Sequence, residues 1–328
     1  MSLQITSTIV IVLAGLLLVI LERIFPYTKG QRFFREGFFN DFILYTIVQS
    51  YVLGLIIFAF LNYIKTHTGL YEYSVVGNWP VWVQVVFFVV VHDFYIYWFH
   101  RWMHNNATLW RLHEAHHSPR TVDWLSGSRS HSLEILINQT VEFAPIILLG
   151  AAPEVAIYKG MISAIWGMFI HSNIDVRLRW LQYIINGPEM HRWHHSDDEG
   201  REYQNNYATK FAFWDWMFGT GFLPNPDEKK PKQYGLRDTP DYPLSPIEYD
   251  KAHPKHIAKV TWVDTVAYFK QHYFAFRRRT SSDAIKEYMK DKKTGKETAR
   301  EMARGIEREI EREIEKGAKN LKHAPQKN

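Results

Sequence analysis

Apolar residues in the N-terminal half of the chain gather in three long runs, at 5–25, 42–64 and 79–99, each with few charged residues. A helix rises about 1.5 Å per residue, so about 20 apolar residues cross a hydrocarbon core of about 30 Å. The pattern therefore predicts three membrane-spanning helices. The first is expected to be retained, because no basic segment precedes it and no small-residue cleavage site stands out.

Two further apolar runs, at 133–150 and 155–170, are separated by a short break at 151–153. The first of them contains two acidic and two amide residues: Glu134, Asn138, Gln139 and Glu142. Polar groups at membrane depth need protein partners. We therefore expect a helical hairpin packed against the other helices rather than two lipid-exposed spans.

The chain becomes polar from about residue 173, and a linker rich in Pro and Lys follows Pro224. The last segment, 281–321, is dense in Glu, Lys and Arg, and its apolar residues recur at every fourth position: Met302, Ile306, Ile310 and Ile314. This spacing predicts a highly charged helix with a narrow apolar stripe. Such a helix packs one edge on a cytosolic domain, or it binds a membrane surface or a partner.

These segments predict an all-α fold, a polytopic transmembrane helical bundle with a cytosolic histidine-rich helical cap and a charged C-terminal helix. We divide the chain into N-terminal transmembrane helices (1–78), a histidine-rich membrane domain (79–224) and a cytosolic linker with an amphipathic helix (225–328). Basic residues follow the first span at Lys29, Arg32 and Arg35, whereas none precedes Arg23. The positive-inside rule then predicts an integral membrane protein with its N-terminus outside, and with its histidine clusters and C-terminus cytoplasmic.

The spacing of the 16 histidines is the strongest chemical signal. The pattern H-x-x-H-H occurs at 113–117 and again at 191–195, and His100 and His104 lie four residues apart. Residues three and four apart share a helix face, so each set is expected to form a compact imidazole cluster. The clustered histidines outnumber the roughly four to six ligands of one ion, so we expect two metal ions.

Composition narrows the possible chemistry. The chain has no cysteine, which excludes thiolate zinc sites, iron–sulfur clusters and disulfides. Its net charge of +5 is not accompanied by a nucleic-acid-binding motif, and a membrane surface accounts for the charge better than nucleic acid does. Aromatic residues make up 16% and crowd near the apolar runs, as in interfacial belts.

The histidine motifs resemble those of the membrane-bound fatty acid hydroxylase and sterol desaturase family. The family pattern D-x-x-x-Y-W-x-H-R-x-x-H begins here at Asp93, and H-x-x-H-H-S begins at His113. HRWHH at 191–195 is followed at 205–220 by NNYATKFAFWDWMFGT, which is similar to the family's N-Y and W-D-x-x-F-G-T ending. Three boxes in this order, with this trailing motif, are far more specific than one H-x-x-H-H.

Two shorter segments resemble the sterol desaturase branch. SHSLE at 130–134 is similar to that branch's HPLE motif, and HSNID at 171–175 occupies the position of its HSGYD-like motif. Ser132 replaces the usual proline, and Gly167 stands where some fatty acid hydroxylases have another histidine. The boxes and these segments together nominate ten metal ligands: His100, His104, His113, His116, His117, His131, His171, His191, His194 and His195.

The resemblance implies a di-iron oxygenase that uses O2 to hydroxylate or desaturate a sterol-like or acyl lipid. Zinc is possible in purified protein, because imidazole sites bind it readily. Electrons must come from an external ferredoxin- or cytochrome-type donor with its reductase, because the sequence has no flavin fingerprint, no cluster cysteine and no haem-binding domain. No side chain beyond the metal ligands is expected to act as a catalyst.

Residues beside the boxes have less specific interpretations. His92 lies outside the family pattern and is expected to be a core residue or to support a ligand. Four carboxylates are candidate acceptors for ligand imidazoles, although each is equally plausible as a helix cap or solvated charge: Asp93, Glu114, Glu189 and Asp197. His272 has no clustered partner and is expected at the surface.

Two other classes of protein remain open from the residues alone. A zinc-dependent membrane hydrolase would need one zinc, fewer essential histidines and neither oxygen nor reductant. A metal transporter would place its histidines at mid-membrane depth on several helices. The position of the histidines at predicted helix ends favours the oxygenase.

Overall fold

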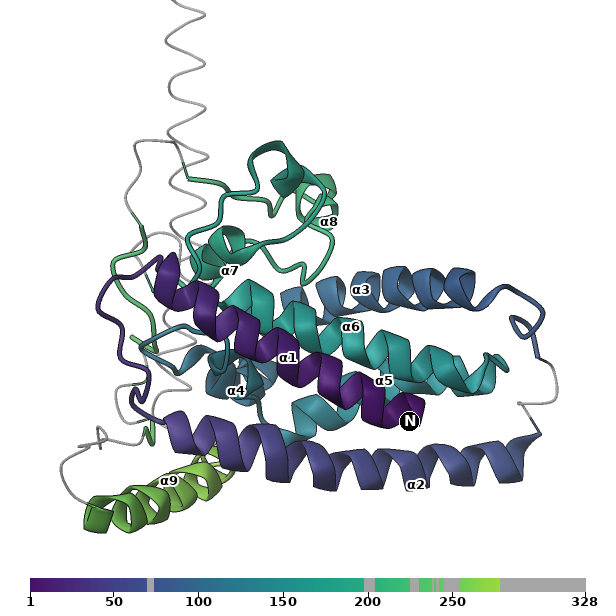
Figure 1. The fold of residues 1–328 in the computed structure, drawn as a ribbon, viewed down its shortest axis with the longest axis horizontal. Helices are drawn as coiled ribbons and strands as arrows, with labels where there is room; N and C mark the ends of the chain where they lie inside the picture. The colour runs from purple at the N-terminus through teal and green to yellow at the C-terminus, as the bar shows by residue number, and fades with distance from the viewer. Residues whose placement is uncertain are drawn as a thin grey trace, which may run out of the picture. The chain divides into compact units, whose positions relative to one another are not determined.

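The computed structural model describes residues 1–69, 74–197, 204–224, 230–237, 239, 242–244 and 254–277. In these residues the chain is helical, and its only pairings of extended backbone are two isolated bridges, Pro26 with Ile174 and Ser196 with Tyr234. Figure 1 shows this arrangement. The all-α prediction is confirmed, whereas the predicted charged helix at 281–321 lies outside the described residues.

Among the described residues, three helical segments are long and apolar enough to cross a membrane. They are α1 (Leu3–Ile24), the continuous segment formed by the π-helical η1 (Asn40–Gln49) and α2 (Ser50–Thr68), and α3 (Val81–Asn105). Large apolar side chains on all three are exposed, among them Leu13, Phe58 and Trp82. Such surfaces are stable against lipid and not against water, so the three predicted spans are confirmed.

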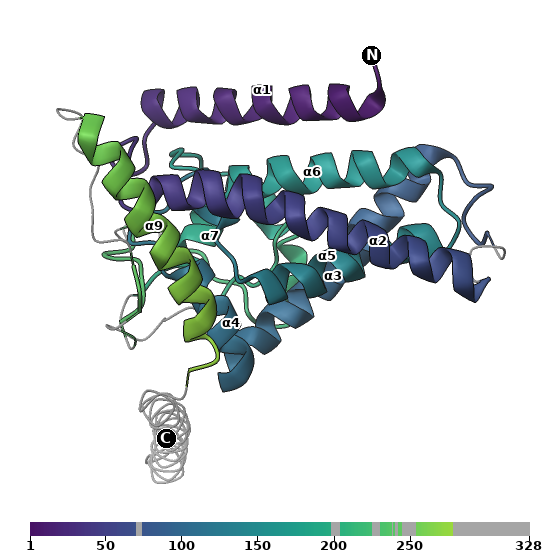
Figure 2. The same cartoon turned by 90° about the horizontal axis from the view of Figure 1, so that it is seen from below.

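The predicted hairpin is formed by α5 (Ser132–Leu148) and α6 (Pro153–His171). In Figures 1 and 2, α1 lies along α6, α2 lies along α5, and α3 contacts both helices of the hairpin. Glu142 of α5 pairs with Lys159 of α6, and Ser163 donates a hydrogen bond to the same carboxylate. The polar residues of this hairpin thus find protein partners, as expected.

The shorter elements gather at one end of the bundle, where α1 and α3 end and α5 begins. They are α4 (Ala107–His117), η3 (Ser126–Ser128), η4 (Arg179–Tyr183), α7 (Pro188–His194) and α8 (Phe213–Met217). The helix α9 (Pro254–Phe274) packs on η1 and α4 at this end. The proposed domain boundaries at residues 79 and 225 stay predictions.

A sharp turn between α3 and α4 brings the first two histidine boxes together. Asn106 is extended, and its side chain accepts hydrogen bonds from the backbone N–H groups of Thr108 and Leu109. This is an N-cap, which starts a new helix in a new direction. The helix α4 therefore folds back against the end of α3.

Buried ion pairs fix the loop that joins α4 to α5. Arg129 donates to both carboxylate oxygens of Asp41 at the start of η1, and Arg35 pairs with Asp41 and with Asp123. All four side chains are buried. Charges withdrawn from water need such hydrogen-bonded partners, so the loop is tied to the second span.

Candidate metal centre

The structure brings nine of the ten nominated histidines together at the end of the bundle. They form two groups, and within each group the candidate ligand atoms lie within 4.8 Å of one another. The five-histidine group consists of His100, His104, His113, His117 and His194. The four-histidine group consists of His116, His171, His191 and His195. All nine side chains are buried.

The ring centroids of each H-x-x-H-H box lie within 5.5 Å of one another, as expected, yet each box contributes histidines to both groups. In the box at 113–117, His116 belongs to the four-histidine group and its two companions to the five-histidine group, whereas in the box at 191–195 His194 alone belongs to the five-histidine group. Positions i and i+4 of a helix lie about 40° apart, whereas i+3 and i+4 lie about 100° apart. Adjacent histidines in each box therefore serve different groups.

The two groups are in contact with each other. The ring centroids of His117 and His195 are 4.4 Å apart, and those of His113 and His116 are 5.0 Å apart. Residues from α3, α4, α6 and α7 meet here although they are far apart in the sequence. The arrangement is one centre with two neighbouring parts rather than two separate sites.

Hydrogen bonds fix the tautomers of five of these rings. Each Nδ1–H donates to an oxygen, at 2.7 to 3.2 Å, which leaves a lone pair on Nε2. The five pairs are His100 with the carbonyl of Tyr207, His113 with the Glu134 carboxylate, His116 with the carbonyl of Arg129, His171 with the carbonyl of Gly167, and His194 with the carbonyl of Asn205.

Facing lone pairs show that the site fits a cation. His100 Nε2 lies 3.0 Å from His113 Nε2, and His171 Nε2 lies 3.3 Å from His116 Nε2, although all four nitrogens are acceptors. Two acceptors at this distance repel unless a positive charge lies between them. Imidazole nitrogens about 2.1 Å from one metal ion are themselves about 3.0 to 3.4 Å apart. The observed spacing matches that of metal ligands.

Burial keeps the histidines of the cap in the neutral form that binds metal. Burial lowers the pKa of five rings well below the ordinary value of an imidazole, and neighbouring imidazoles lower the pKa further. These five are His116, His117, His191, His194 and His195. A proton on Nε2 would compete with a metal ion. These neutral rings can therefore bind a metal ion at neutral pH.

His131, the tenth nominated ligand, lies outside both groups. Its Nδ1 accepts a hydrogen bond from the backbone N–H of Leu133, so the side chain caps α5. Its ring lies 4.7 Å from that of His272, which also contacts Ser132 and stacks near Tyr45. His272 is thus half-buried against the hairpin and not a surface residue.

Glu134, which is not among the four carboxylates nominated as imidazole acceptors, accepts a hydrogen bond from His113 Nδ1. Asp93 instead accepts from Thr209 and from the backbone N–H groups of Lys210 and Phe211. It thereby positions the segment that follows the third box.

The trailing motif has a comparable structural role. Asp215 is buried and accepts from the backbone N–H groups of Tyr207 and Ala208 and from the hydroxyl of Thr220. This fixes the backbone at 205–208, whose carbonyls orient His194 and His100. This motif is one of the grounds for the resemblance to the family, and the structure shows its physical role, which is to hold the backbone that orients two histidines.

The sequence model of the family described as fatty acid hydroxylase matches residues 85–220, which contain both histidine groups. The chain contains a fatty acid hydroxylase domain. This domain runs from α3 to residue 220, and it contains all nine histidines and the residues that accept their Nδ1 hydrogen bonds. The resemblance inferred from the boxes is therefore confirmed.

Several curated proteins are similar to the chain. The ornithine lipid hydroxylase OlsE of Rhizobium tropici is 30% identical over 63% of this chain and 64% of its own length. Human alkylglycerol monooxygenase is 29% identical over 56% of this chain and 40% of its own length. Rat methylsterol monooxygenase 1 is 29% identical over 45% of this chain and 50% of its own length. The chain thus spans less than two thirds of each of these relatives. No solved structure matches it.

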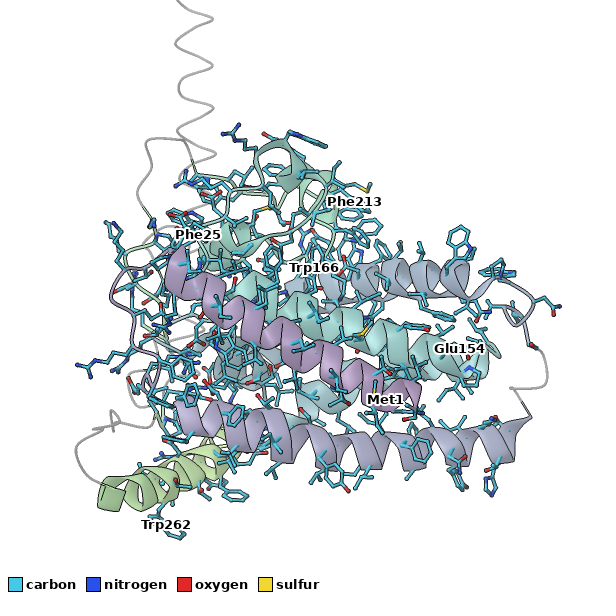
Figure 3. All side chains as sticks on the ribbon, in the orientation of Figure 1. Met1, Phe25, Glu154, Trp166, Phe213 and Trp262 are labelled. Atoms are coloured by element: carbon cyan, nitrogen blue, oxygen red, sulfur yellow. The ribbon has the colours of Figure 1, made fainter. Side chains whose placement is uncertain are left out.

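A cavity of about 200 Å³ adjoins the metal centre of the hydroxylase domain. Five histidines of the two groups line it, and its surface is mainly apolar, with Ile96, Phe99, Met103, Trp166 and Ile170 in the wall. Trp166, on α6, is labelled in Figure 3. A second cavity of about 370 Å³ shares Ile135, Ser163 and Gly167 with the first and reaches Ile11 of α1.

Replacing Glu134 tests the support given to the five-histidine group. We expect Glu134→Ala to weaken metal binding and turnover by about 10- to 100-fold, because outer partners of ligand imidazoles have effects of this size. Glu134→Gln retains an acceptor for His113 Nδ1–H and should recover much of the loss. The measurement is metal content after dialysis together with turnover, and equal loss in both variants would contradict the role given to this carboxylate.

Proposed function

We propose that the protein is a membrane-bound non-haem di-iron oxygenase that hydroxylates or desaturates a lipid with O2 and external electrons. The proposal rests chiefly on the facing Nε2 lone pairs within two adjoining groups of buried histidines. Its second support is the fatty acid hydroxylase domain that contains them.

The two groups would each hold one iron, the first through His100, His104, His113, His117 and His194 and the second through His116, His171, His191 and His195. When bound, the irons supply the O2 activation that breaking an unactivated C–H bond requires. The chain's own part is to aim the Nε2 lone pairs by means of the Nδ1 hydrogen bonds. Its apolar walls exclude water from the reacting carbon.

The lipid would lie in the apolar cavity beside the histidines. The second cavity gives a route toward the helices that face lipid, because its wall includes residues of α1 and of the second span as well as of the hairpin. A lipid can then reach the metal centre without leaving the bilayer. The names of the similar proteins, which refer to an ornithine lipid, an alkylglycerol and a methylsterol, support a lipid substrate.

The electron donor would be a separate ferredoxin- or cytochrome-type protein. A groove on the metal-centre end is lined by basic side chains, among them Lys29, Arg32, Arg120 and Arg237. Asp197, which also lines it, is only two residues from His195. Electrostatic steering favours an acidic partner at such a groove. The same basic residues support a cytoplasmic location for this end, with the N-terminus outside.

The zinc hydrolase and the transporter have less support. Nine gathered histidines exceed what one catalytic zinc and its water require. Both histidine groups also lie at one end of the bundle, whereas an ion path needs ligands at successive depths.

Isotope labelling tests the proposed reaction. Membranes that contain the protein are supplied with a lipid extract, a reductant and 18-O-labelled oxygen, and lipid masses are compared with those from His194→Ala membranes. We expect either an 18-O label or the loss of two hydrogens in a lipid, in the wild type alone. Equal product formation without oxygen would overturn the oxygenase and favour the hydrolase.

A further inference from the structure

A buried polar cluster lies inside the bundle, away from the metal centre. It consists of Lys159 on α6, Glu142 on α5 and His92 on α3, and each side chain is less than 10% exposed. Lys159 pairs with Glu142, and its Nζ lies 3.0 Å from His92 Nδ1. His92 precedes His100 by eight residues, about 12 Å along the helix. Ionisable groups at membrane depth are costly and usually have a function.

The contact with Lys159 fixes the tautomer of His92. An ammonium group has three donors and no acceptor, so Lys159 donates and His92 Nδ1 accepts. The neutral ring then carries its proton on Nε2. This nitrogen is buried, and among the described residues it has no hydrogen-bond partner. His92 therefore holds a buried N–H donor that lacks an acceptor.

The same ring forms part of the wall of the cavity beside the metal centre. The wall also includes His100, His113 and His171 of the metal centre. The surface of this cavity as a whole is mainly apolar. An unpaired buried donor costs free energy, which an acceptor entering the cavity would recover.

We propose that His92 is a specificity-determining residue that donates a hydrogen bond from Nε2 to an acceptor oxygen within the apolar part of the lipid. The inference rests on the proposed lipid oxidation and adds a substrate class to it. The lipid carries a hydroxyl, ether or ester oxygen about two helical turns, roughly 12 Å, from the metal-ligand level. Glu142 and Lys159 act as positioning residues, because they hold the imidazole in the donating tautomer.

A matched pair of probes measures this hydrogen bond without turnover. Dioctyl ether and heptadecane have the same number of heavy atoms and differ only in one oxygen in place of a methylene. Their equilibrium binding is measured with protein in lipid nanodiscs, and empty nanodiscs correct for partition into lipid. We expect the ratio of ether to alkane affinity to be about five- to tenfold higher for the wild type than for His92→Phe, as for one net hydrogen bond.

Two further variants keep the result interpretable. His92→Gln retains an N–H donor near the position of Nε2 and should keep the ether preference, whereas His67→Phe, an exposed site on α2, should leave it unchanged. If His92→Phe is recovered without its metal, His92→Leu removes the same donor in a smaller volume. A ratio equal in the wild type and the variant without the donor overturns the inference, and so does equal loss with Gln and with Phe.

The binding assay separates this inference from the proposed function. Because it uses neither oxygen nor reductant, an ether preference can be present in a protein that forms no oxidised lipid, which would count against the oxygenase alone. Conversely, labelled lipid products without any effect of His92 on the ether preference would count against the role of His92 alone.

Discussion

Replacing His194 or His195 by Ala should abolish turnover, with losses of at least about 100-fold, yet the two variants should lose different metal ions. The two residues are adjacent in sequence but belong to different groups. His194→Ala leaves the four-histidine group intact, and His195→Ala leaves the five-histidine group intact. Removal of a direct ligand should exceed the 10- to 100-fold effect typical of outer partners.

Metal analysis and Mössbauer spectroscopy of anaerobically purified, iron-loaded protein distinguish the two variants. Each is expected to retain about one iron, and the two remaining irons should have different spectra because their ligand sets differ. His67→Ala, at an exposed position on α2, is the matched control. Identical spectra, or full iron content in both variants, would contradict the division of the third box between two groups.

The second large effect is expected at Gly127, in the short helix η3. A Cβ atom at this position would lie 2.5 Å from Nδ1 and 2.8 Å from Cγ of His171. The imidazole is held by the carbonyl of Gly167 and cannot yield without losing its place among the four histidines. Gly127→Ala should therefore displace His171, empty the four-histidine group and reduce turnover by more than about 10-fold.

A second glycine provides the control for this substitution. Gly54 lies in α2, and an added Cβ there would meet nothing within 4 Å. Gly54→Ala should leave metal content and turnover unchanged, and it should stabilise the helix slightly because alanine loses less backbone freedom. Normal iron content and activity in Gly127→Ala would show that the ring is not confined as the structure indicates.

Much of this architecture can be predicted from the sequence, because its physical causes are local. Apolar runs of about 20 residues determine the spans, and the polar residues at Glu134 and Glu142 indicate a hairpin that needs protein partners. The three- and four-residue spacing of the histidines likewise indicates metal ligands on helices, and their positions place them near helix ends. The resemblance to the fatty acid hydroxylase family follows from motifs in a fixed order, and the family model matches residues 85–220.

The assignment of histidines to groups depends on contacts that spacing does not encode. His116 joins His171 and His191 because α4 folds back at Asn106 and because α6 and α7, which carry the other two residues, contact each other. The same limit applies to His131, whose side chain caps α5 instead of approaching a group. Carbonyl acceptors such as that of Tyr207 have no sequence signal, because every residue has a carbonyl.

The effect of Gly127 could not be predicted from one sequence either. Its backbone has no unusual conformation, and the reason for a glycine is the close approach of His171, 44 residues later in the chain. Asp93 and Asp215 belong to recognisable motifs, but their role in shaping the segment after the third box follows from backbone contacts. The need for a glycine at position 127 and the roles of the two aspartates therefore depend on long-range packing, which the sequence pattern does not reveal.

The most direct test of the central claim is the metal content of the wild-type protein purified without oxygen and reconstituted with ferrous iron. The account predicts about two irons per chain, held with comparable affinity, and turnover that requires both O2 and reductant. A single metal ion per chain at saturation, or turnover sustained by one zinc in the absence of oxygen, would contradict it.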